Sequence, residues 1–159
     1  MIRLSGKLRK PIGGRDERTP HSSDDPDDSM RVLFIEDDRM NRRVVKDMLG
    51  VAGAEMVEAD SAEAGLAILD SEEFDMLLVD LRMPGMDGIT AIRHIRARGD
   101  AKAQLPVIVV TADAGADLRE QCLAAGADDV LFKPVAMDSL FDAMGRILAK
   151  NAGAGGVIV

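Results

Sequence analysis

Short apolar runs alternate along this chain with segments of helical periodicity, and this alternation restricts the possible folds more than any other feature. Four runs are strongly apolar, at residues 32–35, 76–79, 107–110 and 130–132, and a weaker one covers residues 55–59. A short run without polar interruption is typical of a strand that is buried on both faces. The sequence therefore predicts strands that are covered by helices on both sides.

Between these runs, apolar residues recur at intervals of three and four, which places them on one face of a helix. The clearest set is Met137, Leu140, Phe141, Met144 and Leu148. A strand–helix unit that repeats five times through right-handed crossovers forms a parallel sheet with helices on both faces. The predicted fold class is therefore α/β.

Residues that start and stop secondary structure fit this pattern. Gly53 and Gly126 stand where two helices should end, and Pro106 introduces a strand. Asp60 followed by Glu63 has the spacing of a capping box at the start of a helix.

The 159-residue chain is expected to hold one domain, residues 30–150, between two tails. Residues 1–29 combine basic residues, then acidic ones, with scattered Gly, Pro and Ser, which is the composition of a disordered tail. Residues 151–159, NAGAGGVIV, are expected to form a glycine-rich stop and a short apolar tail.

Charge and cysteine content favour a cytoplasmic protein that binds neither nucleic acid nor membrane. The chain has 20 basic and 28 acidic residues, and its net charge of −8 opposes binding to a phosphate backbone. No signal peptide is recognisable, and no apolar run is long enough to span a bilayer. The single cysteine, Cys122, suits a reducing compartment and is expected to be a small hydrophobic residue on a helix.

Polar side chains stand directly after four of the predicted strands. Three acids, Glu36, Asp37 and Asp38, follow the first run; Asp80 follows the third, Thr111 the fourth and Lys133 the fifth. Because functional groups of an open parallel sheet gather beyond the carboxyl ends of its strands, these side chains are expected to converge.

The chemistry of this set points to a phosphoryl group. Neighbouring carboxylates repel one another unless they bind protons or a cation, and oxygen ligands of this kind suit Mg²⁺. Together with the Lys133 ammonium and the Thr111 hydroxyl, such an ion would bind the oxygens of a phosphoryl group. Asp80 is then the candidate nucleophile, which would form an acyl phosphate.

Four motifs in order make residues 30–150 resemble the receiver domain of two-component response regulators. They are IEDD at 35–38, VDLRMPGMDG at 79–88, VVTA at 109–112 and FKPV at 132–135. The resemblance implies a flavodoxin-like (βα)5 fold with strand order 2-1-3-4-5. It also implies a signalling switch, not a classical enzyme, whose aspartate accepts phosphate from a histidine kinase or a histidine phosphotransfer protein.

Site roles follow from the same resemblance. Asp80 matches the phosphate acceptor, Asp37 the main Mg²⁺-binding acid, and Glu36 the upstream acid that assists it. The backbone carbonyl of Arg82 matches the third protein ligand of the ion. Thr111 matches the switch hydroxyl and Lys133 the lysine that contacts phosphate.

Some assignments within these motifs stay open. Asp38 is the alternative to Glu36 in the acid pair, although it is also expected to cap the first helix. Residues 83–85, with Asp87 and Gly88, are expected to shape the acceptor loop and the next helix cap. Arg82 and Asp113 are predicted to pair over the site and to influence how water reaches the acyl phosphate.

Val130 departs from the family pattern, because many receivers have an aromatic residue three positions before the lysine. A rotating aromatic ring cannot operate there, so the response uses the loop and the fourth helix without it, or output is weak. The favoured function is a stand-alone receiver whose target binds the face made by the fourth helix, fifth strand and fifth helix. Alternatives are a phosphorelay intermediate or phosphate sink, and a binding module that is independent of phosphorylation.

Other classes fit the sequence less well. An aspartate-nucleophile phosphatase would need a second acid where Arg82 stands, and a nucleotide-binding fold would need glycines where three acids follow the first strand. Zinc chemistry lacks ligands, since His21 lies in the tail and His94 stands alone on a predicted helix.

Overall fold

Five parallel strands form one sheet in the order β2-β1-β3-β4-β5, which confirms the predicted order. The structure is a computed structural model that describes residues 29–156, so most of the predicted N-terminal tail and residues 157–159 lie outside the described part. The strands are β1 (Arg31–Ile35), β2 (Glu55–Ala59), β3 (Met76–Val79), β4 (Val107–Thr111) and β5 (Asp129–Phe132). Each predicted apolar run is therefore a strand, and the fold is the flavodoxin-like one.

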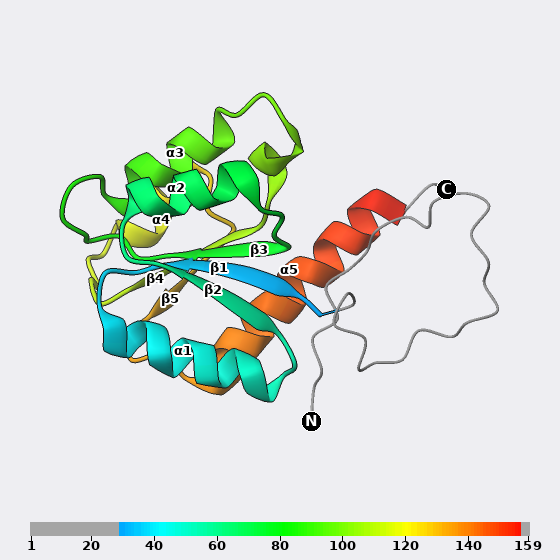
Figure 1. Cartoon of the computed structure of the whole chain (residues 1–159), viewed down its shortest axis with the longest axis horizontal. Helices are drawn as coiled ribbons and strands as arrows, with labels where there is room; N and C mark the ends of the chain where they lie inside the picture. Colours follow the sequence, from blue (N-terminus) through cyan, green and yellow to red (C-terminus); the bar gives the residue numbers. More distant parts are fainter. Residues whose placement is uncertain (1–28, 157–159) are drawn as a thin grey trace.

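Helices cover both faces of this sheet (Figure 1). They are α1 (Arg39–Val51), α2 (Ala62–Ser71), α3 (Gly88–Arg96), α4 (Leu118–Ala125) and α5 (Met137–Gly156), with a short 3-10 helix, η2 (Ala101–Gln104). In Figure 1, α2 and α3 lie on one side of the sheet and α1 on the other. Within residues 29–156, no helix is both long and apolar enough to cross a bilayer.

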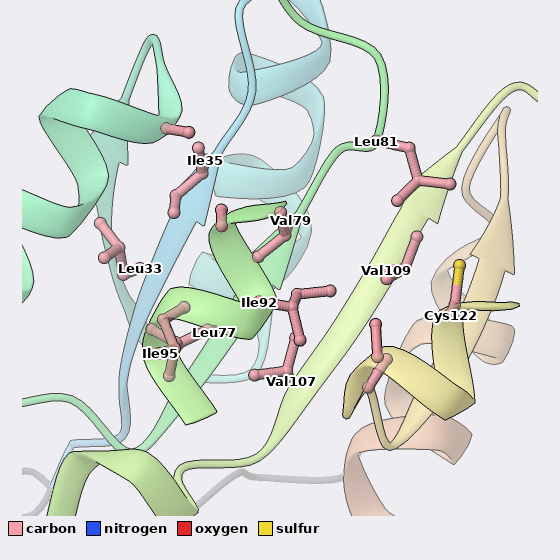
Figure 2. Close-up of a cluster of buried hydrophobic side chains, with 14 of the residues drawn as sticks. Leu33, Ile35, Leu77, Val79, Leu81, Ile92, Ile95, Val107, Val109 and Cys122 are labelled. Atoms are coloured by element: carbon pink, nitrogen blue, oxygen red, sulfur yellow. The ribbon is translucent and has the colours of Figure 1, made fainter. Parts of the chain in front are cut away.

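The core has two layers because successive strand residues point to opposite faces. Leu33, Leu77 and Val109 belong to the layer under α2, α3 and α4, which also contains Cys122 of α4 (Figure 2). Phe34 and Leu78 belong to the layer under α1 and α5. Cys122 is fully buried, which confirms its predicted role as a small hydrophobic residue.

Local signals at helix ends agree with the structure in most cases. Gly126 is the C-cap of α4 with a φ of 119°, and Gly53 has a φ of 80° just after α1, so both glycines occupy conformations that other residues avoid. The predicted capping box at Asp60 is wrong. Ser61 has the extended backbone of an N-cap and accepts a hydrogen bond from the Ala64 amide at 3.0 Å, so α2 begins one residue later than that box requires.

The last helix is longer than the sequence suggested, since α5 continues past Lys150 to Gly156. A glycine in a helix costs only about 1 kcal/mol relative to alanine. Glycines in this segment therefore do not by themselves end a helix whose earlier turns are packed on the sheet.

Candidate functional site

The carboxyl ends of β1, β3, β4 and β5 meet at one edge of the sheet and bring the predicted polar residues together. Ile35 lies opposite Val79 in the register, so Glu36 and Asp80 follow side by side. Thr111 lies opposite Phe132, so Lys133 follows beside it, and the Lys133 amide donates to the Thr111 carbonyl at 2.8 Å. The predicted convergence is confirmed.

Three carboxylates form the acidic part of this site. Oxygen atoms of Glu36, Asp37 and Asp80 all lie within 4.8 Å of one another. Glu36 is completely buried and Asp80 is 4% exposed, whereas Asp37 is exposed. Asp38, the alternative partner, instead caps α1 and accepts hydrogen bonds from the amides of Met40 and Asn41 at 2.8 and 3.1 Å. The geometry thus groups Glu36, not Asp38, with Asp37.

Lys133 lies between two of these acids. Its Nζ is 2.6 Å from Glu36 Oε1 and 3.4 Å from Asp80 Oδ1. Burial alone would lower the pKa of Lys133, but its contacts with Glu36 and Asp80 outweigh that effect and raise the pKa above its ordinary value. The lysine is therefore a fixed positive charge beside the Asp80 carboxylate.

The charged forms of Glu36 and Asp37 are disfavoured at this site. Burial raises the pKa of Glu36, and the neighbouring Asp80 carboxylate raises it further, against the opposing effect of Lys133. Burial and the Glu36 carboxylate likewise raise the pKa of Asp37. Because the charged forms are disfavoured, a bound cation would relieve the repulsion.

This donor set fits Mg²⁺, which takes carboxylates from the protein and keeps several waters. The carboxylates open into a cleft of about 240 Å³, whose walls include the three acids, Lys133, Thr111, Asn41 and Arg82. One face of the set thus stays accessible to water and to a further ligand.

Thr111, the last residue of β4, and Arg82, in the loop after β3, border this cleft. The Thr111 hydroxyl is buried and accepts a hydrogen bond from the Asp113 amide at 3.1 Å, which leaves its proton for another acceptor. The Arg82 guanidinium pairs with the Asp113 carboxylate, with Nε 3.1 Å from Oδ2, which confirms the predicted ion pair. Asp113 raises the pKa of Arg82, and Arg82 lowers the pKa of Asp113.

Residues 83–85 and the start of α3 shape the acceptor loop, as predicted. Gly85 has a φ of 80°, and Asp87 caps α3 through a hydrogen bond from the Thr90 amide at 2.8 Å. One contact of this loop was not predicted: the Glu63 carboxylate accepts a hydrogen bond from the Met86 amide at 3.2 Å, which fixes the loop to α2. The sequence indicates Glu63 only as part of a capping box.

Arg42 was also missed. Its Nη1 donates to the backbone carbonyls of Glu36 and Asp37, so it contacts the main chain of the acidic loop. Nothing in the sequence singles it out, since Arg39, Arg43 and Lys46 give the same helix other basic residues.

His94, by contrast, lies where the sequence placed it, exposed on α3. It takes no part in the acidic cluster.

Comparisons with known proteins agree with this geometry. Residues 32–145 match the family model described as the response regulator receiver domain. The chain is 36% identical to the virulence sensor protein BvgS of Bordetella parapertussis over 96% of its own length and 12% of BvgS. It is 40% identical to the response regulator protein FleR of Pseudomonas aeruginosa over 73% of its length and 24% of FleR.

Among solved structures, the receiver domain of the sensor histidine kinase PA1611 from Pseudomonas aeruginosa has a TM-score of 0.70 and 30% identity, with 76% of this chain and 98% of that one covered. That structure is described with a magnesium ion coordinated in its active site cleft. A putative response regulator from Chloroflexus aurantiacus has a TM-score of 0.72 and 29% identity, with 76% of this chain and 98% of that one covered. The chain spans a small part of BvgS and FleR but nearly all of the isolated receivers, and it belongs to the response regulator receiver domain family.

Proposed function

We propose that the chain accepts a phosphoryl group on Asp80 from a phosphohistidine of a histidine kinase or phosphotransfer protein. The observation that carries this proposal is the position of Asp80, a buried carboxylate 3.4 Å from the Lys133 ammonium and grouped with two further acids at an accessible cleft. Burying a carboxylate close to other carboxylates costs folding free energy. Groups of this kind are concentrated at functional sites, which supports a role for Asp80 in the chemistry.

Each residue has a distinct part in the proposed transfer. Glu36, Asp37, Asp80 and the backbone carbonyl of Arg82 would hold Mg²⁺, and the bound ion would neutralise charge on the phosphoryl oxygens. Lys133 supplies a second positive charge, and the Thr111 hydroxyl donates to a phosphoryl oxygen. An oxygen of Asp80 attacks phosphorus as the phosphorus–nitrogen bond breaks, and the electron pair of that bond stays on the imidazole nitrogen, which then takes a proton from water.

Phosphotransfer with a matched pair of variants tests the proposal. Wild-type protein incubated with a labelled phosphohistidine donor and Mg²⁺ should acquire acid-stable, base-labile label, and Asp80→Asn should acquire none. Asp38→Asn is the control, since asparagine also caps helices and the cap is the contact that Asp38 makes. Label that persists in Asp80→Asn, or that is lost equally in Asp38→Asn, would contradict the assignment.

The relatives bear on the place of this reaction in a pathway. BvgS is named as a virulence sensor protein and PA1611 as a sensor histidine kinase, and the similarity of the chain to parts of them supports a phosphorelay intermediate or phosphate sink as the second candidate. Back-transfer of phosphate from Asp80 to a phosphotransfer protein would favour that candidate, and a long-lived phosphoprotein would favour a switch. For a switch, we place the downstream target on the face of α4, β5 and α5, in the cytoplasm.

A further inference from the structure

Two consecutive backbone carbonyls lose their sheet partners where β1 ends. The Glu36 amide still donates to Ala59 of β2, at 2.9 Å, but the chain then turns away toward α1. Carbonyls at the end of a strand need other donors, because an unpaired buried backbone group is costly. In this loop the carbonyls belong to Glu36 and Asp37, whose side chains form the acidic cluster.

Arg42, the fourth residue of α1, supplies those donors. Its Nη1 lies 2.8 Å from the Glu36 carbonyl oxygen and 3.2 Å from that of Asp37. Only 14% of the Arg42 side chain is exposed, so water competes little for the partly buried contact with Glu36, whereas the contact with Asp37 lies at the surface. A guanidinium that binds both carbonyls holds them on the α1 side of the loop, and the two carboxylates are then free to face the cleft.

The guanidinium is itself fixed from the other side. Its Nε donates to Glu58 Oε1 of β2 at 2.9 Å, and Lys46 Nζ lies 3.2 Å from the other oxygen of Glu58. Arg42, followed by Lys46, lowers the pKa of Glu58, so this carboxylate stays charged. Arg42 is thus held between the edge strand and the acidic loop.

We propose that Arg42 is the positioning residue of the Mg²⁺ site, setting the separation of the Glu36 and Asp37 carboxylates through their own main chain. This inference rests on the proposed function, because the ion is the ligand that those acids are proposed to hold. Arg42 touches neither the ion nor the phosphoryl group. Its effect is on the affinity for the cation.

The experiment measures Mg²⁺ binding alone, by calorimetric titration of the whole chain without a phosphodonor. Arg42→Gln should weaken binding about 10-fold, which is the low end for residues that orient metal ligands. The matched control is Arg43→Gln, which removes the same charge from the next residue. Arg43 is exposed and pairs with Asp47 one turn away at 3.7 Å. Its variant should bind Mg²⁺ within about twofold of wild type, because exposed ion pairs contribute little.

Two more variants separate positioning from charge and from folding. Arg42→Lys keeps the charge but lacks the planar fork that reaches two carbonyls and Glu58 together, so it should bind Mg²⁺ with intermediate affinity. Glu58→Gln leaves Arg42 in place and removes its charged anchor, and it should weaken binding less than Arg42→Gln does. Far-UV circular dichroism on each sample establishes that the chain is folded at the titration temperature.

Equal weakening in Arg42→Gln and Arg43→Gln would overturn the inference, since net charge alone would then explain the effect. Wild-type affinity in Arg42→Lys would overturn it for the same reason. Wild-type affinity in Arg42→Gln, with Asp80 still phosphorylated in the wild-type chain, would overturn the inference and leave the proposed function standing. If Arg42→Gln alone weakens Mg²⁺ binding, but the wild-type chain acquires no label on Asp80, the positioning role is supported and phosphate acceptance is contradicted.

Discussion

Replacement of Gly88 by alanine is the sharpest test of how Asp80, the proposed phosphate acceptor, is held. Gly88 is the first residue of α3, and its amide donates to the Leu81 carbonyl at 2.9 Å. A Cβ atom at this position would lie 2.3 Å from the Asp80 carbonyl oxygen and 2.8 Å from Leu81 Cα. Both neighbours are backbone atoms, so no side chain can rotate away to make room.

The size of the effect follows from these distances. Opening the closest contact to the 3.4 Å at which ordinary van der Waals contact begins requires a shift of about 1 Å between α3 and the strand end that carries Asp80. Overpacking of this kind costs about 1–3 kcal/mol. Because both clashes are with backbone atoms, the upper part of this range, about 2–3 kcal/mol, applies. Alanine loses less conformational entropy on folding than glycine does, which offsets at most about 1 kcal/mol of this cost. Gly88→Ala should therefore lower the free energy of unfolding by about 1–2 kcal/mol net.

The assay is urea unfolding followed by circular dichroism, since the chain has no tryptophan or tyrosine for fluorescence. Gly145→Ala is the control, because a Cβ on this exposed glycine of α5 meets no atom within 4 Å. It should raise the free energy of unfolding by about 0.5–1 kcal/mol. Gly88→Ala should also slow phosphorylation of Asp80. A Gly88→Ala variant as stable as wild type would contradict the close approach of α3 to the backbone of Asp80.

Two further changes act on the loops around the site. Asp87→Ala removes the cap of α3 and should cost about 1 kcal/mol at neutral pH. The Thr90 amide lowers the pKa of Asp87 in the folded state, so this stability is present above the ordinary pKa of 3.8 and is lost as pH falls through the lowered value. Urea titrations should thus give wild type and variant equal stability in strong acid, and a gap that persists there would contradict the cap. Arg82→Ala removes the ion pair with Asp113 and should speed autodephosphorylation several-fold with little change in unfolding; an unaltered lifetime of the labelled phosphate refutes this.

The strand ends were predictable because two strong rules act together. A continuously apolar run identifies a buried strand, and parallel crossovers bring all carboxyl ends to one edge. Asp80 and Lys133 could therefore be placed together although 53 positions separate them in the chain. The ion pair of Arg82 with Asp113 could be predicted in a similar way, since Arg82 stands two positions beyond Asp80 and Asp113 two positions beyond Thr111.

Contacts made by long side chains were not predictable by these rules. Arg42 and Arg43 are adjacent arginines on one helix, and only the position of β2 decides which of them reaches the acidic loop. Glu63 likewise fits a capping box by spacing, but its carboxylate reaches the acceptor loop because Ser61 already caps the helix. A local sequence pattern indicates which residues could make a contact, and the tertiary structure determines which of them does.

The side chains around Thr111 limit how phosphorylation could change the surface of the protein. Val130 is 4% exposed and packs in the core layer under α4. As a valine, it has no aromatic ring that could move between the interior and the surface. A continuous set of contacts does link Thr111 to the Asp113 amide and the Asp113 carboxylate to Arg82. A displacement of Thr111 toward a phosphoryl group would pull on Asp113 and hence on the acceptor loop. We therefore expect the response of this receiver to begin in the two loops that precede α3 and α4, with β5 following and not leading.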